Sequence, residues 1–138
     1  MSISGGCACG AVRFESVTKP LTTRICWCRV CQYLGAGSAT VNATFHTEGF
    51  SVSGKVASHR FVADSGNVMY RDFCPACGTP LFSRAEVRPH LVVVRAGALD
   101  EPEIARPEMT IWTSAAPSWA CFDANIPQLP GQAPPPKA

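Results

Sequence analysis

Hydrophobic and polar residues alternate with a period of two near the start of this 138-residue chain. In residues 11–15, Val12 and Phe14 fall on one face of an extended strand and their polar neighbours fall on the other. Segments rich in β-branched and aromatic residues, separated by turn residues, predict further strands at 38–45, 50–54, 58–63, 68–73, 91–95 and 109–113. Few segments have a helical period. We therefore predict a mainly β fold of roughly eight short strands.

The length fits a single domain, which we place at residues 1–126. The cluster Asp-Ser-Gly-Asn at 64–67 predicts a turn that joins two of the strands into a hairpin. From Pro127 the chain becomes proline-rich and ends in Pro-Pro-Pro-Lys-Ala. This tail, 127–138, is predicted to be disordered or extended, and an unstructured terminus is favoured over an SH3-type ligand.

Composition and charge narrow the functional classes. Hydrophobic residues make up 46% and charged residues 16%, which is typical of a globular protein. The formal charge is +2 and no basic run occurs, so nucleic-acid binding is disfavoured. The longest aliphatic run, 91–94, is far shorter than a membrane helix, which needs about 20 residues. The N-terminus lacks the features of a secretory signal, so we expect a cytoplasmic protein.

The chain has eight cysteines, and seven of them lie in three tight groups. The groups are Cys7/Cys9, Cys26/Cys28/Cys31 and Cys74/Cys77, and Cys121 stands alone. A disulfide framework is disfavoured, because disulfides are rare in a reducing compartment and because seven clustered thiols leave one unpaired. The hypothesis of a redox site at 74–77 is less favoured than zinc binding, since no strand–helix pattern follows these residues. Thiolates this close together can bind one zinc ion, and we predict zinc, two ions per chain.

Structural zinc sites are closed and are usually built from two ligand pairs. The pairs Cys7/Cys9 and Cys74/Cys77 would form such a site, called here the four-cysteine cluster, and would join the first strand to a distant knuckle. Cys26, Cys28 and Cys31 remain as the three-cysteine cluster. Three protein ligands with one open position are typical of catalytic zinc. The alternative is a closed site whose fourth ligand comes from the following residues: Cys121, His46, His59 or His90.

Metal binding also changes the charge of the protein. Seven thiolates and two zinc ions turn the tabulated +2 into about −1. This further disfavours nucleic acid as a partner.

Three motifs match a known family in the right order. They are Gly-Cys-Ala-Cys-Gly-Ala-Val-Arg-Phe at 6–14, Cys-x-Cys-x-x-Cys at 26–31 followed by Gly-Ala, and Phe-Cys-Pro-Ala-Cys-Gly-Thr-Pro-Leu-Phe at 73–82. Residues 96–100, 111–112 and 117–119 fit its C-terminal pattern. Over about 5–127 the chain resembles the glutathione-dependent formaldehyde-activating enzyme family, which includes centromere protein V.

This resemblance implies a β-tent fold of small antiparallel sheets with zinc knuckles. It implies a structural zinc at the four-cysteine cluster and a catalytic zinc at the three-cysteine cluster, the partition that spacing also favours. The implied reaction joins formaldehyde to glutathione to give S-hydroxymethylglutathione, which is carbon–sulfur lyase chemistry. The implied partner is therefore a small thiol or thiol adduct such as glutathione.

Three further residues are candidates for substrate contacts. Arg29 lies within the three-cysteine motif and Arg24 lies just before it; either could hold a carboxylate or offset the charge of the thiolates, or lie on the surface in water. Trp27 either covers the metal or fills the core. The rivals to an enzyme are a non-catalytic zinc module that binds a protein or nucleic acid, and a thiol-based metal or redox handler.

Overall fold

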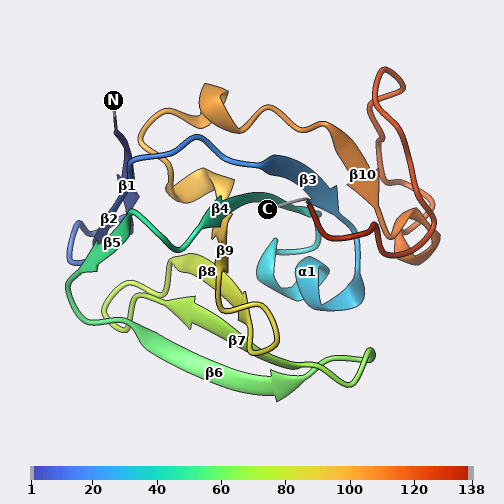
Figure 1. Cartoon of the computed structure of the whole chain (residues 1–138). Helices are drawn as coiled ribbons and strands as arrows, with labels where there is room; N and C mark the ends of the chain where they lie inside the picture. Colours follow the sequence, from blue (N-terminus) through green and yellow to red (C-terminus); the bar gives the residue numbers. More distant parts are fainter. Residues whose placement is uncertain (1, 137–138) are drawn as a thin grey trace.

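Ten β-strands form two sheets in the part of the chain that the computed structural model describes, residues 2–136 (Figure 1). The smaller sheet has the strand order β1-β2-β5 and the larger has the order β10-β3-β4-β9-β8-β7-β6. All pairs are antiparallel except β10 with β3, which is parallel. The strands are β1 (Ile3–Gly6), β2 (Arg13–Ser16), β3 (Thr22–Cys26), β4 (Thr40–His46), β5 (Phe50–Ser53), β6 (Ala57–Val62), β7 (Val68–Phe73), β8 (Pro80–Ala85), β9 (Leu91–Arg95) and β10 (Met109–Ile111).

The predicted mainly β fold is confirmed, and each predicted strand lies within a few residues of an observed one. Three strands, β1, β3 and β8, were not predicted. The first contains two glycines, the second is mostly polar, and the third begins at Pro80, so none shows a clear alternation. The chain also contains one short α-helix, α1 (Arg29–Leu34), and three 3-10 helices at Ala96–Ala98, Pro102–Ala105 and Thr113–Ala115.

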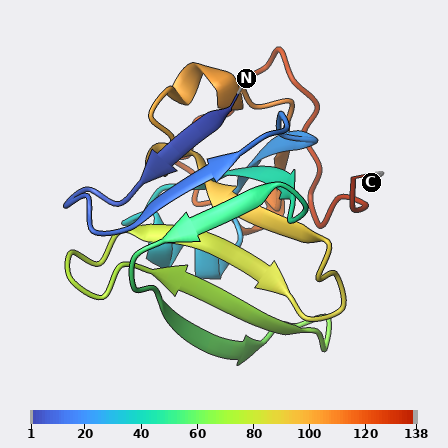
Figure 2. The ribbon, with the colours of Figure 1, turned by 60° about the vertical axis from the view of Figure 1, so that its left-hand side comes forward.

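The main hydrophobic core lies between the two sheets (Figure 2). Phe14 of β2 and Phe50 of β5 stack with ring centroids 5.6 Å apart, and Phe82 of β8 meets both rings edge-on. Offset and edge-on aromatic pairs are favourable arrangements, so this group joins the small sheet to the large one.

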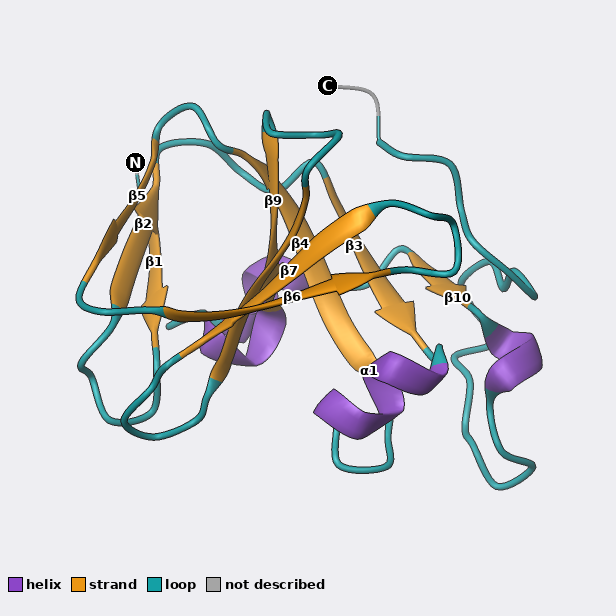
Figure 3. Cartoon of the chain, turned by 90° about the horizontal axis from the view of Figure 1, so that it is seen from below, coloured by secondary structure: helices purple, strands orange, loops and turns teal. Residues whose placement is uncertain are grey.

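The opposite face of the large sheet is polar near its centre. Side chains alternate between the faces of a strand, and directly paired residues share a face. Ala43 is paired with Val94, and both are fully buried in the main core. Their neighbours Asn42 and Arg95 are paired on the other face, together with Arg24. Helix α1 packs against β4 at the end of this region (Figure 3).

The proline-rich segment packs against this domain as far as Pro134. The backbone N–H of Leu129 donates to the Thr110 carbonyl of β10, and the Thr110 N–H donates to the Pro127 carbonyl. Arg24 donates to the Pro134 carbonyl, and Ala133 is only 3% exposed. The sequence predicts a tail that is disordered or extended, and the structure shows an extended segment held by backbone hydrogen bonds. Residues 137–138 lie outside the described part of the chain.

An ion pair closes the end of the small sheet. Arg13 of β2 donates two hydrogen bonds to Asp100, and the Ser4 hydroxyl donates a third. These donors hold the pKa of the Asp100 carboxyl below its ordinary value of 3.8. The contribution to stability is therefore present above that value and is lost as the pH falls through the lowered folded pKa.

We expect Asp100→Asn to lower the melting temperature at pH 7 by no more than about 3 °C, since the pair is nearly half exposed. At pH 3 the difference from the parent protein should be smaller, because that pH is below the ordinary carboxyl pKa of 3.8 and the stabilisation decreases toward the lowered folded pKa. Thermal unfolding followed by circular dichroism at both pH values checks this. An equal difference at both would show that the carboxylate charge contributes nothing.

Among residues 2–136, the structure contains no helix long and apolar enough to cross a bilayer.

Candidate functional site

The four-cysteine cluster joins the end of β1 to the end of β7. Its Sγ atoms all lie within 4.8 Å of one another. The Cys7 and Cys9 sulfurs are 3.5 Å apart, and those of Cys9 and Cys74 are 3.8 Å apart. Four sulfurs arranged tetrahedrally around zinc, each about 2.3 Å from it, would be separated by about 3.8 Å. The observed separations therefore fit zinc.

Backbone and side-chain donors surround these sulfurs. The Val12 N–H points at the Cys7 sulfur at 3.2 Å, and the Cys77 N–H points at the Cys74 sulfur at 3.4 Å. The Thr79 hydroxyl lies 3.1 Å from the Cys77 sulfur, and hydrogen bonds from Thr79 lower the pKa of Cys77 to about 5. Donors of this kind favour the thiolate, the form that binds metal.

The three-cysteine cluster lies where β3 ends and α1 begins. Cys26 is the last residue of β3, Cys28 is the N-cap of α1, and Cys31 is within the helix. The Cys28 sulfur accepts the Cys31 N–H at 3.3 Å, as the side chain of an N-cap residue does. The same sulfur atom caps the helix and could also bind a metal.

The sulfurs of this cluster also lie within 4.8 Å of one another. Hydrogen bonds from the Cys26 and Cys31 thiols lower the pKa of Cys28, and the same contact with Cys28 raises the pKa of Cys26. These shifts favour the thiolate at Cys28 over the thiolate at Cys26, and binding of a metal would displace the protons that remain on the sulfurs. A soft, all-thiolate set of donors suits zinc.

Among residues 2–136, no histidine, carboxylate or further cysteine joins the three-cysteine cluster. Cys121 is exposed, and its sulfur lies near only the Trp119 carbonyl, at 4.0 Å. His46 ends β4, His59 lies in β6, and His90 is on an exposed turn. The described side chains thus offer three ligands here and four at the other cluster.

Arg95 lies beside the three-cysteine cluster and was missed by the sequence analysis. It ends β9 and donates a hydrogen bond to the Asn42 side chain. Burial lowers the pKa of Arg95, while the charges of the three nearby sulfurs and a hydrogen bond to Cys31 oppose that shift. A buried guanidinium beside thiolates offsets their negative charge. The available signal was an arginine that directly follows the apolar run 91–94.

We expect Arg95→Gln to weaken retention of metal by the three-cysteine cluster by about tenfold, corresponding to one pKa unit of lost thiolate stabilisation. Metal at the four-cysteine cluster should be retained as in the parent protein. Competition with a chelator, followed by metal analysis, measures both. Arg60→Gln is the matched control because Arg60 is exposed on β6. Equal retention in the parent and Arg95→Gln proteins would contradict the role given to Arg95.

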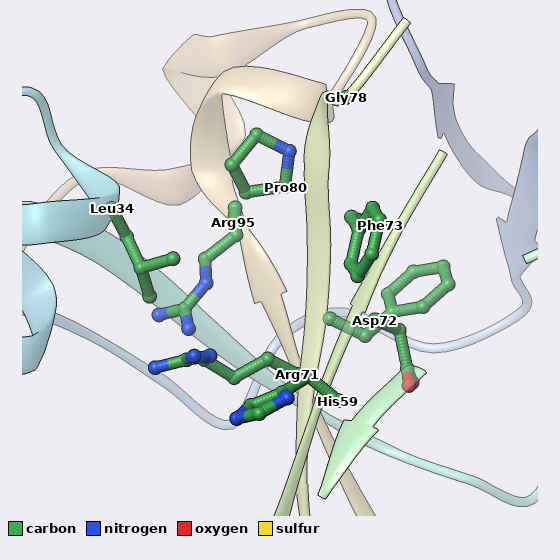
Figure 4. A pocket seen from close by; sticks show the side chains of 9 residues that line it. Leu34, His59, Arg71, Asp72, Phe73, Gly78, Pro80 and Arg95 are labelled. Atoms are coloured by element: carbon green, nitrogen blue, oxygen red, sulfur yellow. The ribbon is translucent and has the colours of Figure 1, made fainter. Parts of the chain in front are cut away.

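A cavity of about 180 Å³ opens next to Arg95, between α1 and the strands β6 to β9 (Figure 4). Its lining comprises Leu34, His59, Arg71, Asp72, Phe73, Gly78, Pro80, Phe82 and Arg95. Leu34 comes from the same helix as Cys31, so the cavity and the three-cysteine cluster share α1 as well as Arg95.

The three substrate-contact residues predicted from the sequence lie outside this cavity. Arg29 is exposed, donates to the Gln32 side chain at 2.6 Å and lies over the Tyr33 ring. Arg24 binds the Pro134 carbonyl, and burial lowers its pKa. The structure brings neither arginine to the cavity.

Trp27 is buried, and its ring meets the rings of Trp119 and Phe122 edge-on. Its indole N–H has no hydrogen-bond partner among the described residues. Trp27 therefore belongs to an aromatic group next to the three-cysteine cluster rather than to the lining of the cavity.

The C-terminal segment covers part of the three-cysteine cluster. Ala133 and Leu129 pack in a small second core with Cys26, Cys31 and Ile111. Sequence reasoning gave no sign of this contact.

Comparison with known proteins assigns the family. The family model described as glutathione-dependent formaldehyde-activating enzyme matches residues 2–115, which include both cysteine clusters. The chain belongs to this family. A Halomonas elongata protein named "Putative glutathione-dependent formaldehyde-activating enzyme" is 28% identical over 131 residues, which cover 91% of this chain and 83% of that protein. The family resemblance stated from the three motifs is thus confirmed.

The fold also occurs in a solved structure. A crystal structure of a Rhodobacter sphaeroides protein superposes with a TM-score of 0.57 at 18% identity, covering 91% of this chain and 98% of that one. At this level of identity the similarity concerns the fold alone.

Proposed function

We propose that this formaldehyde-activating family member is a zinc-dependent enzyme of the carbon–sulfur lyase type. Its substrate would be a thiol adduct of the kind that formaldehyde forms with glutathione. The observation that carries the proposal is the contrast between the clusters. One cluster has four sulfurs, whereas the other has three and shares Arg95 and helix α1 with a cavity.

Cys26, Cys28 and Cys31 would hold the catalytic zinc, and the four-cysteine cluster would hold a structural one. Zinc with a free fourth position supplies acidification of a bound thiol or polarisation of a carbonyl or hydroxyl oxygen. Arg95 has a separate role: three thiolates and one zinc carry a charge of about −1, and its guanidinium offsets that charge.

The reaction itself is balanced without a further reactant. The sulfur lone pair forms a bond to the carbonyl carbon, the π electrons move to the oxygen, and the proton lost from the thiol ends on that oxygen. In the reverse direction the carbon–sulfur bond breaks and the proton returns to sulfur. The role of the chain is to bring the two reactants together and to exclude water. The aromatic group around Trp27 and the packing of Ala133 next to the cysteines would exclude the water.

Cobalt substitution tests the proposal, because cobalt absorption in the visible range reports the number and type of ligands. We expect glutathione to shift the bands of the cobalt-loaded protein in a saturable way, and S-methylglutathione to leave them unchanged. Exchange spectroscopy by NMR should then show faster interconversion of glutathione and S-hydroxymethylglutathione with the zinc protein than without it. Unchanged bands together with unchanged exchange rates would contradict the proposed function.

A further inference from the structure

The cavity beside the three-cysteine cluster contains an excess of positive charge. His59 of β6 and Arg71 of β7 are directly paired in the sheet, so their side chains leave the same face. Figure 4 shows both side chains together, with the Arg71 guanidinium close to that of Arg95. Two guanidinium groups and an imidazole therefore border one small space.

The single carboxylate in the lining does not balance this charge. Asp72 is 5% exposed, and its two oxygens accept hydrogen bonds from Arg84 and from the Ser58 hydroxyl. Its side chain turns away from Arg71 in Figure 4. Asp72 and Arg84 thus neutralise each other on the opposite face of β7.

Arg71 is positioned but lacks an anionic partner. Its guanidinium lies over the Phe61 ring, 4.7 Å from the centroid, which limits its movement. Across residues 2–136, the two ion pairs are Arg13 with Asp100 and Arg84 with Asp72, and no side-chain hydrogen bond involves Arg71. With Arg95 assigned to the thiolates, Arg71 remains as one uncompensated positive charge at the cavity.

We propose that Arg71, with His59 beside it, binds the carboxylate of an acidic thiol adduct whose sulfur end reaches the three-cysteine cluster past Arg95. A guanidinium grips a carboxylate through two parallel hydrogen bonds and so fixes its orientation. This inference rests on the proposed function and names the class of substrate that the site selects: a thiol bearing a carboxylate at one end.

The size of the cavity limits what is enclosed. A volume of about 180 Å³ equals that of about six water molecules. One carboxylate-bearing arm of a peptide-sized thiol fits inside it, and the rest of such a molecule would lie outside. Recognition through a single arm therefore tolerates variation elsewhere in the substrate.

The test compares an acid with its neutral amide. The probes are S-methyl mercaptopropionate and S-methyl mercaptopropionamide, which have nearly the same shape and carry no free thiol. Their dissociation constants from the zinc-loaded parent, Arg71→Ala, Arg71→Lys and Arg60→Ala proteins are measured by NMR titration. Arg60 is the control, because it adjoins His59 on β6 but points to the other face.

We expect the parent to bind the acid about tenfold more tightly than the amide, since a charged hydrogen-bonded pair is lost with the amide. Arg71→Ala should abolish the preference, Arg71→Lys should retain part of it, and Arg60→Ala should retain all of it. Equal binding of acid and amide by the parent, or an undiminished preference in Arg71→Ala, would overturn the carboxylate site.

Turnover separates this inference from the proposed function. The hydroxymethyl adducts of free mercaptopropionate and mercaptopropionamide are compared as substrates. A binding preference for the acid without turnover of either adduct supports the carboxylate site and contradicts the enzyme. Turnover of both adducts with the same kcat/KM, and with no preference in binding, supports the enzyme and overturns the carboxylate site.

Discussion

Replacing Cys74 with serine is expected to unfold most of the domain at room temperature. Cys74 is fully buried, belongs to the main hydrophobic core and lies 3.8 Å from the Cys9 sulfur, 65 positions away in the sequence. Zinc at a structural site contributes on the order of 10 kcal/mol to folding, about as much as the total stability of a domain. Circular dichroism and metal analysis of the purified variant would measure the loss of structure and of zinc.

Cys121→Ser is the matched control for this experiment. Cys121 is exposed and lies outside both clusters, so that variant should retain two zinc ions and the melting temperature of the parent. If the Cys74→Ser protein lost one zinc ion but had the same melting temperature as the parent, the four-cysteine cluster would not be needed for stability.

Replacing Cys28 with serine is expected to remove turnover while leaving most of the fold intact. The three ligands lie within six consecutive residues, so the loss of metal there releases only a short segment and the start of α1. We expect activity to fall by at least about 10³-fold, since the metal supplies the chemistry of the proposed reaction. Turnover, zinc content and thermal unfolding should be measured on the same preparation.

A Cys28→Ser protein that unfolded as extensively as Cys74→Ser would indicate that both ions are structural. A folded variant that lost one zinc and kept its activity would contradict the catalytic role of the three-cysteine cluster.

The cysteine clusters could be predicted from the sequence because metal ligands recur at short spacings. The pairing of Cys7/Cys9 with Cys74/Cys77 followed from the number of ligands that a closed zinc site needs. Two strands were predictable from local signals: β7 follows the turn cluster at 64–67, and β9 is a short run of apolar, mostly β-branched residues.

Arg95 and Arg71 could not be found in this way. Their position at the cavity depends on strand order, in which β9 lies between β4 and β8 and β7 lies one strand further out. Order and register are long-range properties, and no local pattern encodes them. Arg24 and Arg29, which are close to the cysteines in sequence, were therefore the more obvious candidates, although neither lines the cavity.

The C-terminal segment shows the limit of composition as a guide. Proline and small residues predict an extended, weakly ordered chain. They do not exclude backbone pairing, and the Thr110 and Leu129 hydrogen bonds hold the segment along β10. Its packing against Cys26 is a tertiary contact that only the folded chain defines.

The two clusters become complete at different times during synthesis of the chain. The ligands of one are all made by residue 31, whereas Cys7 and Cys9 lack their full set of partners until residue 77 is made. At about 5–20 residues per second, the ribosome needs roughly 2–9 s to translate the 46 residues between these two points. During that interval Cys7 and Cys9 lack Cys74 and Cys77, whereas the three-cysteine cluster already has its full set of sulfurs. With zinc at both clusters, as proposed, five cysteines from two different sites would be available to the first ion before Cys74 and Cys77 are made.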